Sequence, residues 1–426
     1  MYSRLTNEVV LYLEPHAGLG TLYNYRTTEK AYLNQDMTEI VLHRIRKGPL
    51  QSFFPPDLPQ GMRDNLLLQS LSALETLETS GFLHESGERC SSNMIKEVKS
   101  VPPLRVVFLE TTKTCNLRCR HCYNGIENNP RGQLSKKELE SIIAQADDLG
   151  VMEIQLTGGE LFVLPFADRL IADLQNRCLP ISVFSNGLYI PAGVTDLLKN
   201  KPYGIIFYIS LDGPEKIHDN VRGKDGAYQK TVANIKMLLE LGCDVRINTA
   251  VGSHNITCIK EFMAFVEKEF GVLHRFVSLE NIGNAEKNSD LLINGNAFAE
   301  LLKGQENEMQ FLDSHDPSTR DWQTPACGVG NAMLFIDAYG NVSLCPTLTQ
   351  REDPKFLAGN IRQANLKEIW EDSPIFNQYR NIQCRCVSSC LKKEACSGGC
   401  RSKAYLDTGD INSPDMEMCA VYGVQK

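Results

Sequence analysis

The stretch 110–123, ETTKTCNLRCRHCY, decides how this chain is interpreted. It places Cys115, Cys119 and Cys122 within eight residues, in the spacing Cys-x3-Cys-x2-Cys. A closed structural zinc site or a complete iron–sulfur cluster has four protein ligands, so three cysteines leave one position on the metal to be explained. Either a fourth ligand lies elsewhere in the chain, or that position is open to another molecule.

The bulk composition is that of an ordinary globular protein. The chain has 426 residues, a net charge of −8 and 42% hydrophobic residues. We expect two or three domains at that length. An acidic chain does not favour general binding to nucleic acid. The sequence has no evident signal peptide and no run of about 18 apolar residues, so we expect a cytoplasmic protein without a membrane partner.

Residues 105–280 alternate short apolar runs with longer stretches of helical spacing. The apolar runs are rich in Val, Ile and Phe, as buried parallel strands are. Six such units predict an α/β fold, a partial (β/α)6 barrel with right-handed crossovers. The expected strands are RVVFLE (105–110), EIQLT (153–157), ISVFS (181–185), IIFYISL (205–211), VRINTA (245–250) and RFVSLE (275–280).

Unusual residues follow these predicted strands at their carboxyl ends. The three-cysteine loop follows the first strand, and TGGE (157–160), SNG (185–187) and SLDG (210–213) follow the next three. Asn248 lies near the end of the fifth strand. Parallel α/β barrels gather their active sites at this rim, so we expect these residues to form one site.

In order and approximate spacing, CNLRCRHC, TGGE, SNG and SLDG resemble the motifs of radical S-adenosylmethionine (radical SAM) enzymes over residues 104–285. The resemblance implies that the three cysteines hold a [4Fe-4S] cluster whose fourth iron binds S-adenosylmethionine. It implies a 5′-deoxyadenosyl radical that abstracts hydrogen from an unactivated carbon. It also implies an electron donor such as flavodoxin or ferredoxin.

The same resemblance assigns further residues to the cofactor. His121 takes the usually aromatic position before the last cysteine, near the adenine. Gly158 and Gly159 lack side chains and let the backbone approach the methionyl group closely, while Glu160 would accept a hydrogen bond from its ammonium. No general acid or base is assigned. The other candidates are Ser185, Asn186, Ser210, Asp212, Asn248 and, as a partner of the carboxylate, Arg222.

A second group of cysteines lies in the last hundred residues. In a reducing compartment such clustering favours metal ligation over disulfides. The segments GNVSLC (340–345) and CLKKEACSGGC (390–400), with the distal Cys419, resemble the SPASM extension of radical SAM enzymes. That extension binds up to two auxiliary [4Fe-4S] clusters, so we expect two here.

The resemblance also implies how the tail cysteines divide. Where the family has Cys-x2-Cys, this chain has Cys384-x-Cys386-x3-Cys390, so Cys384 is open between the two clusters. It also stays open whether the first cluster is fully ligated. A pair of zinc ribbons is the alternative use of so many cysteines. The implied ligands are Cys327, Cys345 and Cys400 for one cluster, and Cys386, Cys390, Cys396 and Cys419 for the other.

Residues 1–95 are expected to form a winged-helix-like domain, followed by a linker at 96–103. The stretch from AYLNQDMTEIVLHRI to LETLETSGFL resembles the peptide-recognition elements of peptide maturases, which bind a leader peptide as an added strand. The alternatives are a structural cap on the barrel or a DNA-binding winged helix. We expect the barrel at 104–300, a bridging region at 301–326 and the SPASM domain at 327–426.

Together these features favour a maturase that forms a thioether or carbon–carbon cross-link in a ribosomally made precursor peptide. The N-terminal domain would hold the leader, and the auxiliary clusters would accept the second electron. Three alternatives stay open: an enzyme of the anaerobic sulfatase-maturing type that makes formylglycine, oxidation of a small cofactor precursor, and a zinc-bound interaction protein.

Overall fold

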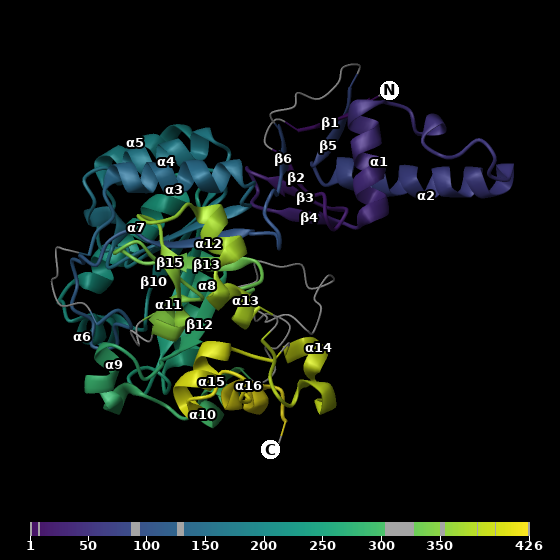
Figure 1. The fold of residues 1–426 in the computed structure, drawn as a ribbon. Helices are drawn as coiled ribbons and strands as arrows, with labels where there is room; N and C mark the ends of the chain where they lie inside the picture. The colour runs from purple at the N-terminus through teal and green to yellow at the C-terminus, as the bar shows by residue number, and fades with distance from the viewer. Residues whose placement is uncertain are drawn as a thin grey trace.

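The computed structural model describes residues 2–6, 9–86, 94–125, 132–302, 328–349, 354–380, 382–396 and 398–424. Its centre is a nine-stranded sheet in the order β12-β11-β10-β9-β8-β7-β13-β14-β15, flanked by helices (Figure 1). A four-stranded sheet, β4-β3-β2-β6, and the pair β1-β5 belong to the N-terminal region. The chain is therefore an α/β protein, as the alternating pattern predicts.

Six neighbouring strands of the large sheet run parallel in chain order, which confirms the partial (β/α)6 barrel. All six predicted strands are present. They are β7 (Val106–Glu110), β8 (Glu153–Thr157), β9 (Ile181–Ser185), β10 (Ile205–Ser210), β11 (Asp244–Val251) and β12 (His274–Ser278). The intervening helices are α3 (Lys136–Asp148), α4 (Ala167–Asn176), α5 (Ala192–Asn200), α6 (Glu215–Arg222), α7 (Ala227–Glu240) and α8 (Ile259–Phe270).

Local sequence signals set the helix ends. At the start of α3, Ser135 Oγ accepts the N–H of Glu138, and the Glu138 carboxylate accepts the N–H of Ser135. Helix α6 ends at Gly223, whose φ of 70° is a left-handed conformation that glycine adopts without strain. The capping box thus fixes the start of α3, and Gly223 ends α6 directly before the short loop that leads to α7.

The tail extends the barrel sheet, which the sequence does not reveal. Strand β13 (Met333–Ile336) pairs in parallel with β7, and β14 (Asn341–Ser343) and β15 (Leu357–Asn360) follow in antiparallel order. The indole N–H of Trp370 donates to the carbonyl of Pro102 (2.7 Å) and joins the tail to the segment before β7. The cysteine-rich tail is therefore continuous with the barrel.

Short helices complete this half of the molecule. Helix α10 packs against α16 (Figure 1), so the segment after β12 contacts the end of the chain. These helices are α9 (Asn284–Lys287), α10 (Gly295–Leu302), α11 (Pro346–Thr349), α12 (Leu366–Asp372), α13 (Pro374–Tyr379), α14 (Lys393–Cys396), α15 (Arg401–Thr408) and α16 (Met416–Val421).

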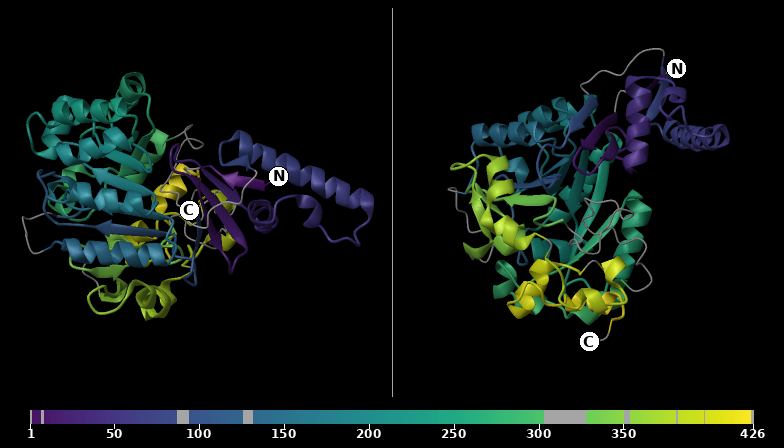
Figure 2. Two further views of the ribbon diagram at one scale, coloured as in Figure 1. Left: turned by 90° about the horizontal axis from the view of Figure 1, so that it is seen from above. Right: turned by 45° about the vertical axis from the view of Figure 1, so that its right-hand side comes forward.

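The N-terminal region is a small sheet covered by two helices, and α2 extends away from the rest of the molecule (Figure 2). Strand β6 pairs in parallel with β2, so this sheet takes in residues that the sequence analysis placed in the linker. The elements are β1 (Tyr2–Leu5), β2 (Val9–Glu14), β3 (Leu19–Asn24), β4 (Lys30–Leu33), α1 (Gln35–Arg46), α2 (Gln60–Thr79), β5 (Leu83–Ser86) and β6 (Ile95–Glu97).

The two faces of this small sheet bury different side chains. One face places Leu11 and Leu22 in a core shared with α1 and α2. The other face places Tyr12, Tyr23 and Tyr25 in a cluster that includes barrel residues. The N–H of Gly204, just before β10, donates to the carbonyl of Tyr25 (2.7 Å). The sheet therefore covers the amino ends of the barrel strands.

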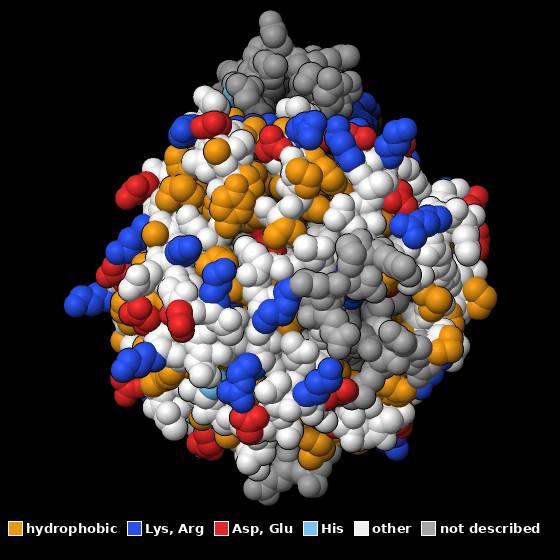
Figure 3. Space-filling model, turned by 90° about the vertical axis from the view of Figure 1, so that its left-hand side faces the viewer, with side chains coloured by type: hydrophobic (Ala, Val, Ile, Leu, Met, Phe, Trp, Pro, Cys, Tyr) orange, Lys and Arg blue, Asp and Glu red, His pale blue; other side chains and the backbone are white. Residues whose placement is uncertain are grey.

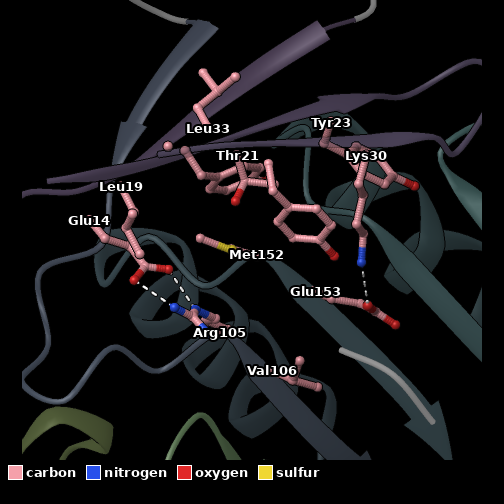
Figure 4. A pocket seen from close by; sticks show the side chains of 13 residues that line it. Glu14, Leu19, Thr21, Tyr23, Lys30, Leu33, Arg105, Val106, Met152 and Glu153 are labelled. Carbon is pink, nitrogen blue, oxygen red and sulfur yellow. Dashed lines mark hydrogen bonds and ion pairs between the residues drawn. The ribbon is translucent and has the colours of Figure 1, made fainter. Parts of the chain in front are cut away.

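Two ion pairs cross this contact (Figure 4). Arg105 binds both carboxylate oxygens of Glu14, through Nε at 2.5 Å and Nη2 at 2.7 Å. Lys30 Nζ lies 3.4 Å from the carboxylate of Glu153 at the start of β8. Burial alone would raise the pKa of Glu153, but Lys30 and neighbouring hydrogen bonds lower it. These contacts support the alternative that the N-terminal domain is a cap on the barrel.

The surface carries mixed charges. On the face seen in Figure 3, basic and acidic side chains of the described residues are interspersed among small hydrophobic patches. Among the described residues, no helix combines the length and the hydrophobicity needed to cross a membrane.

We predict that Arg105→Met destabilises the protein by about 3 kcal/mol, because it leaves the Glu14 carboxylate buried without a counterion. The loss would appear as a lower midpoint of urea denaturation under anaerobic conditions. The control is Arg362→Met, which removes an exposed arginine paired with Glu138 and should cost about 1 kcal/mol or less. Equal losses in the two variants would contradict the role assigned to the buried pair.

Candidate functional site

The three cysteines of the 110–123 stretch lie in one loop that lines a cavity of about 500 Å³. Cys119 is buried, and Cys115 and Cys122 are half-buried. The N–H of Arg120 donates to the carbonyl of Val221 near the end of α6 (2.8 Å), which ties the loop to the barrel. The structure thus brings the predicted ligands together at the carboxyl rim.

N–H groups point at two of the cysteine sulfurs. Cys115 Sγ accepts the N–H of Leu117 (3.4 Å) and lies 3.8 Å from Nδ2 of Asn186. Cys119 Sγ lies 3.8 Å from Nη1 of Arg222. Donors of this kind surround the thiolate ligands of iron–sulfur clusters. Burial raises the pKa of Cys115 to about 12 and that of Cys119 to about 11, so both side chains are protonated thiols in the absence of a metal and would lose these protons when a cluster binds. The loop therefore fits a [4Fe-4S] cluster.

The glycine turn after β8 lies directly against this loop. A Cβ on Gly159 would lie 2.3 Å from the carbonyl oxygen of Thr114, and one on Gly158 would lie 2.8 Å from that of Thr112. The N–H of Gly159 also donates to Thr112 (2.5 Å). Both glycines line the cavity, as predicted for the cofactor. Because neither glycine has a side chain, the backbone of this turn can also contact the backbone of the cysteine loop at Thr112 and Thr114.

Glu160 supports the neighbouring turn. Its Oε1 accepts hydrogen bonds from Ser185 Oγ (2.9 Å) and the N–H of Phe162 (3.1 Å), and its Oε2 accepts the N–H of Asn186 (2.8 Å). Burial raises its pKa to about 7. Of the described residues, Ser185 and Asn186 line the cavity and Glu160 does not. Glu160 therefore positions the SNG turn, and its hydrogen bond to the cofactor stays a prediction.

Helix α7 holds the SNG turn from the other side. Thr231 Oγ1 donates to the carbonyl of Asn186 (3.1 Å), and Asn234 Nδ2 donates to that of Gly187 (2.7 Å). Asn186 Nδ2 donates to Oδ1 of Asn116 in the cysteine loop (2.8 Å). Asn186 is thereby oriented towards the cavity, next to Cys115.

Asp212 and Arg222 form a buried ion pair. Arg222 Nε lies 2.6 Å from Asp212 Oδ2, and Asp212 is fully buried. Although burial alone would raise it, the Arg222 guanidinium holds the pKa of Asp212 well below its usual range. Arg222 lines the cavity, and among the described residues Asp212 does not. Asp212 is thus one carboxylate partner of Arg222, and the contact of Arg222 with the carboxylate of the cofactor stays a prediction.

His121 lines the cavity beside this pair. Its ring lies parallel to that of His254, with 6.1 Å between centroids, and Nε2 is 3.8 Å from Asp212 Oδ2. Burial lowers the pKa of His121 to about 3, so the ring is neutral. Ser210 and Asn248, which pair in register on β10 and β11, line the same cavity.

Two of the tail cysteines line the cavity, and three others lie near one another. Cys345 and Cys400 line the cavity, on walls contributed by the tail. Cys396 is flanked by Cys390 and Cys419, and burial raises its pKa to about 12. Cys345 and Cys400 come from one of the ligand sets expected from the sequence, and Cys390, Cys396 and Cys419 come from the other; both sets stay predictions.

The surroundings of the three remaining tail cysteines, Cys384, Cys386 and Cys327, are known in different detail. Cys384 is buried, and a Cβ on Gly398 would lie 3.4 Å from its Cβ. Cys384 therefore lies beside the turn that leads to Cys400. Cys386 is half-buried, and Cys327 lies outside the described residues.

Sequence reasoning missed several residues of the cavity. Gln155 Nε2 donates to the Glu153 carboxylate (3.0 Å), while its Oε1 is buried without a partner among the described residues. The sequence signal that could have found Gln155 is its amide side chain, which stands within the otherwise largely apolar strand EIQLT. On the far wall, Lys403 lies 2.5 Å from Glu417 and 2.7 Å from Ser278 Oγ. No local sequence pattern connects these side chains, because β12 and the tail helices are far apart in the sequence and contact each other only after folding.

Comparisons with known proteins give two family matches. The model of the radical SAM superfamily matches residues 109–266. The model of SPASM, an iron–sulfur cluster-binding domain, matches residues 327–401. The two matches cover the three-cysteine loop with most of the barrel, though not β12, and most of the second cysteine group.

Individual proteins resemble the chain at low identity. The AdoMet-dependent heme synthase of Methanosarcina barkeri is 26% identical, over 72% of this chain and 93% of that protein. The subtilosin biosynthesis protein AlbA of Bacillus subtilis is 28% identical, over 71% of this chain and 68% of that protein. Structures of Streptococcus suis SuiB with S-adenosylmethionine and with its precursor peptide SuiA have TM-scores of 0.65 and 0.64. At 15% identity they cover 96% and 97% of this chain and 98% of theirs, and share its fold.

We predict that Gly159→Ala removes about four irons per chain from the reconstituted protein, because the new methyl group displaces Thr114 and with it Cys115. Iron and sulfide analysis after anaerobic reconstitution measures the loss. Gly61→Ala is the control, since a Cβ on Gly61 meets nothing within 4 Å. An unchanged iron content in Gly159→Ala would show that the contact does not position the loop.

Proposed function

The chain belongs to the radical SAM superfamily and carries a SPASM domain, and from that premise we propose that it modifies a ribosomally made precursor peptide. The product would be a cross-link, a thioether or a carbon–carbon bond, between residues of that peptide. Homologues such as AlbA and SuiB, whose names or structures refer to peptide products or precursors, support this substrate class.

The observation that carries the proposal is the shared cavity. Its lining includes both the three-cysteine loop and Cys345 and Cys400 of the tail. Its volume of about 500 Å³ is within the usual range for a ligand site. Phe108, Phe184 and Phe276 give it apolar walls that would exclude water and hold a peptide side chain.

The chemistry divides between the cofactors and the protein. When bound, the radical SAM cluster and S-adenosylmethionine supply a 5′-deoxyadenosyl radical that removes a hydrogen atom from carbon. Closing a cross-link removes two hydrogens in all, so it also needs an electron acceptor, which clusters held by the tail cysteines would provide. The chain's own residues bind the peptide between these two places and orient its C–H bond.

The N-terminal domain offers two surfaces for the leader of that peptide. Strand β4 is an edge strand of the described sheet, paired with β3 alone, so a peptide strand can be added beside it. Helix α2 exposes Met62, Leu68 and Leu71, which are apolar side chains that a leader helix or strand would cover. The likeness to SuiB extends over this domain, because it covers 96% of the chain.

The proposal is tested with anaerobically reconstituted protein, S-adenosylmethionine and dithionite in place of flavodoxin or ferredoxin. Peptides encoded beside the gene are added, and 5′-deoxyadenosine and peptide mass are followed. A peptide lighter by two hydrogens supports the proposal. 5′-Deoxyadenosine without any peptide product, but with turnover of a porphyrin precursor, would instead favour a small-molecule enzyme like the heme synthases.

We predict that Cys400→Ala keeps formation of 5′-deoxyadenosine but lowers the cross-linked peptide at least about tenfold, because the electron acceptor in the cavity is damaged. Liquid chromatography with mass spectrometry measures both products. Cys258→Ala is the control: Cys258 is half-buried, precedes α8 and is not among the residues that line the cavity. Equal loss of both products in Cys400→Ala, with Cys258→Ala unaffected, would contradict the separate role of the tail.

A further inference from the structure

The guanidinium of Arg222 lies between a carboxylate and a cysteine sulfur. Its Nε donates to Asp212 Oδ2 (2.6 Å), and its Nη1 lies 3.8 Å from Cys119 Sγ. A planar guanidinium has donors in a fixed fork, so holding one side of it also directs the other side. Arg222 therefore presents an N–H group to the cluster-binding loop in a direction that Asp212 sets.

Asp212 itself is held on several sides. Its Oδ1 accepts the N–H of Ala250 (3.1 Å), and its backbone carbonyl accepts Nδ2 of Asn255 (2.7 Å). Its backbone N–H donates to Nδ1 of His218 (3.2 Å). A carboxylate fixed in this way cannot follow Arg222 if the arginine moves. Asp212 is thus the fixed partner of the pair.

Backbone contacts fix the distance from Arg222 to the cysteine loop. Helix α6 ends at Gly223, and a Cβ there would lie 2.6 Å from the carbonyl oxygen of Arg118. Two residues further along the loop, Arg120 donates its backbone N–H to the carbonyl of Val221 (2.8 Å). The end of α6 and the loop therefore move as one unit, with Arg222 facing Cys119.

We propose that Arg222 raises the reduction potential of the cluster held by Cys119, and that Asp212 positions Arg222 and limits this effect. An N–H group and a positive charge beside a cluster sulfur stabilise the reduced cluster, which carries one more negative charge. Because the pair is buried, solvent and salt screen this interaction little. Asp212, which acts through Arg222, is in this view a positioning residue of the metal site. The inference depends on the cluster and is independent of the peptide substrate.

The test is a redox titration of the reconstituted holoprotein, without peptide, followed by electron paramagnetic resonance. The signal that changes when S-adenosylmethionine is added belongs to the cluster of the three-cysteine loop. Arg222→Met should lower its midpoint potential, because the donor and the charge are lost. Asp212→Asn should raise it, because the charge of Arg222 is no longer offset. A merely structural role would not shift the two variants in opposite directions.

Arg120→Met is the matched control. It removes a positive charge from the same loop, but Arg120 pairs at 2.9 Å with Asp290 in an exposed position, so the midpoint should stay at the wild-type value. An unchanged midpoint in an Arg222→Met protein with full iron content would overturn the proposal. If Arg222→Met binds less iron, Arg222→Gln takes its place, since it keeps N–H donors without the charge. A midpoint of Arg222→Gln at or above the wild-type value would then overturn it.

Discussion

The contact between two stretches of backbone, the glycine turn after β8 and the three-cysteine loop after β7, is the constraint on which the site depends. Gly159 lies so close to Thr114 that no side chain can separate them. The two loops follow neighbouring strands in register, so the sheet brings them together and the glycines let them touch. Once the loop is fixed, the positions of Cys115 and of the side chains around it follow.

The surrounding groups act on one another and not only on a ligand. The Glu160 carboxylate accepts hydrogen bonds from the SNG turn, and that turn orients the side chain of Asn186 towards Cys115. Asp212 similarly holds Arg222, which faces Cys119. Glu160 and Asp212, which the resemblance assigns to the cofactor, thus also hold neighbouring side chains in place. In a buried site, a charged group is stable only when protein donors or a counterion compensate it.

The sequence predicts the barrel well because its strands are apolar runs followed by distinctive loops. Two segments show this pattern, in which an apolar strand leads directly into the rim residues: EIQLT followed by TGGE, and ISVFS followed by SNG. The pairing of β13 with β7 was not predictable, because it joins segments more than two hundred residues apart whose apolar patterns fit many partners. The same is true of Lys403 and Glu417, which reach the cavity only through that pairing and the packing of the tail helices.

The N-terminal sheet packs against the barrel and supports its amino end. Both of its faces are covered, one by α1 and α2 and the other by the barrel. Its Glu14 pairs with Arg105, which directly precedes β7, and its Lys30 pairs with Glu153, the first residue of β8. Both partners lie at the opposite end of the strands from the three-cysteine loop. Moving this domain as a unit would expose Tyr12, Tyr23 and Tyr25 and break both ion pairs at once. A leader peptide bound at its edge, as we propose, would therefore be held on a fixed support, and the segment after the leader would itself have to reach the cavity at the carboxyl rim.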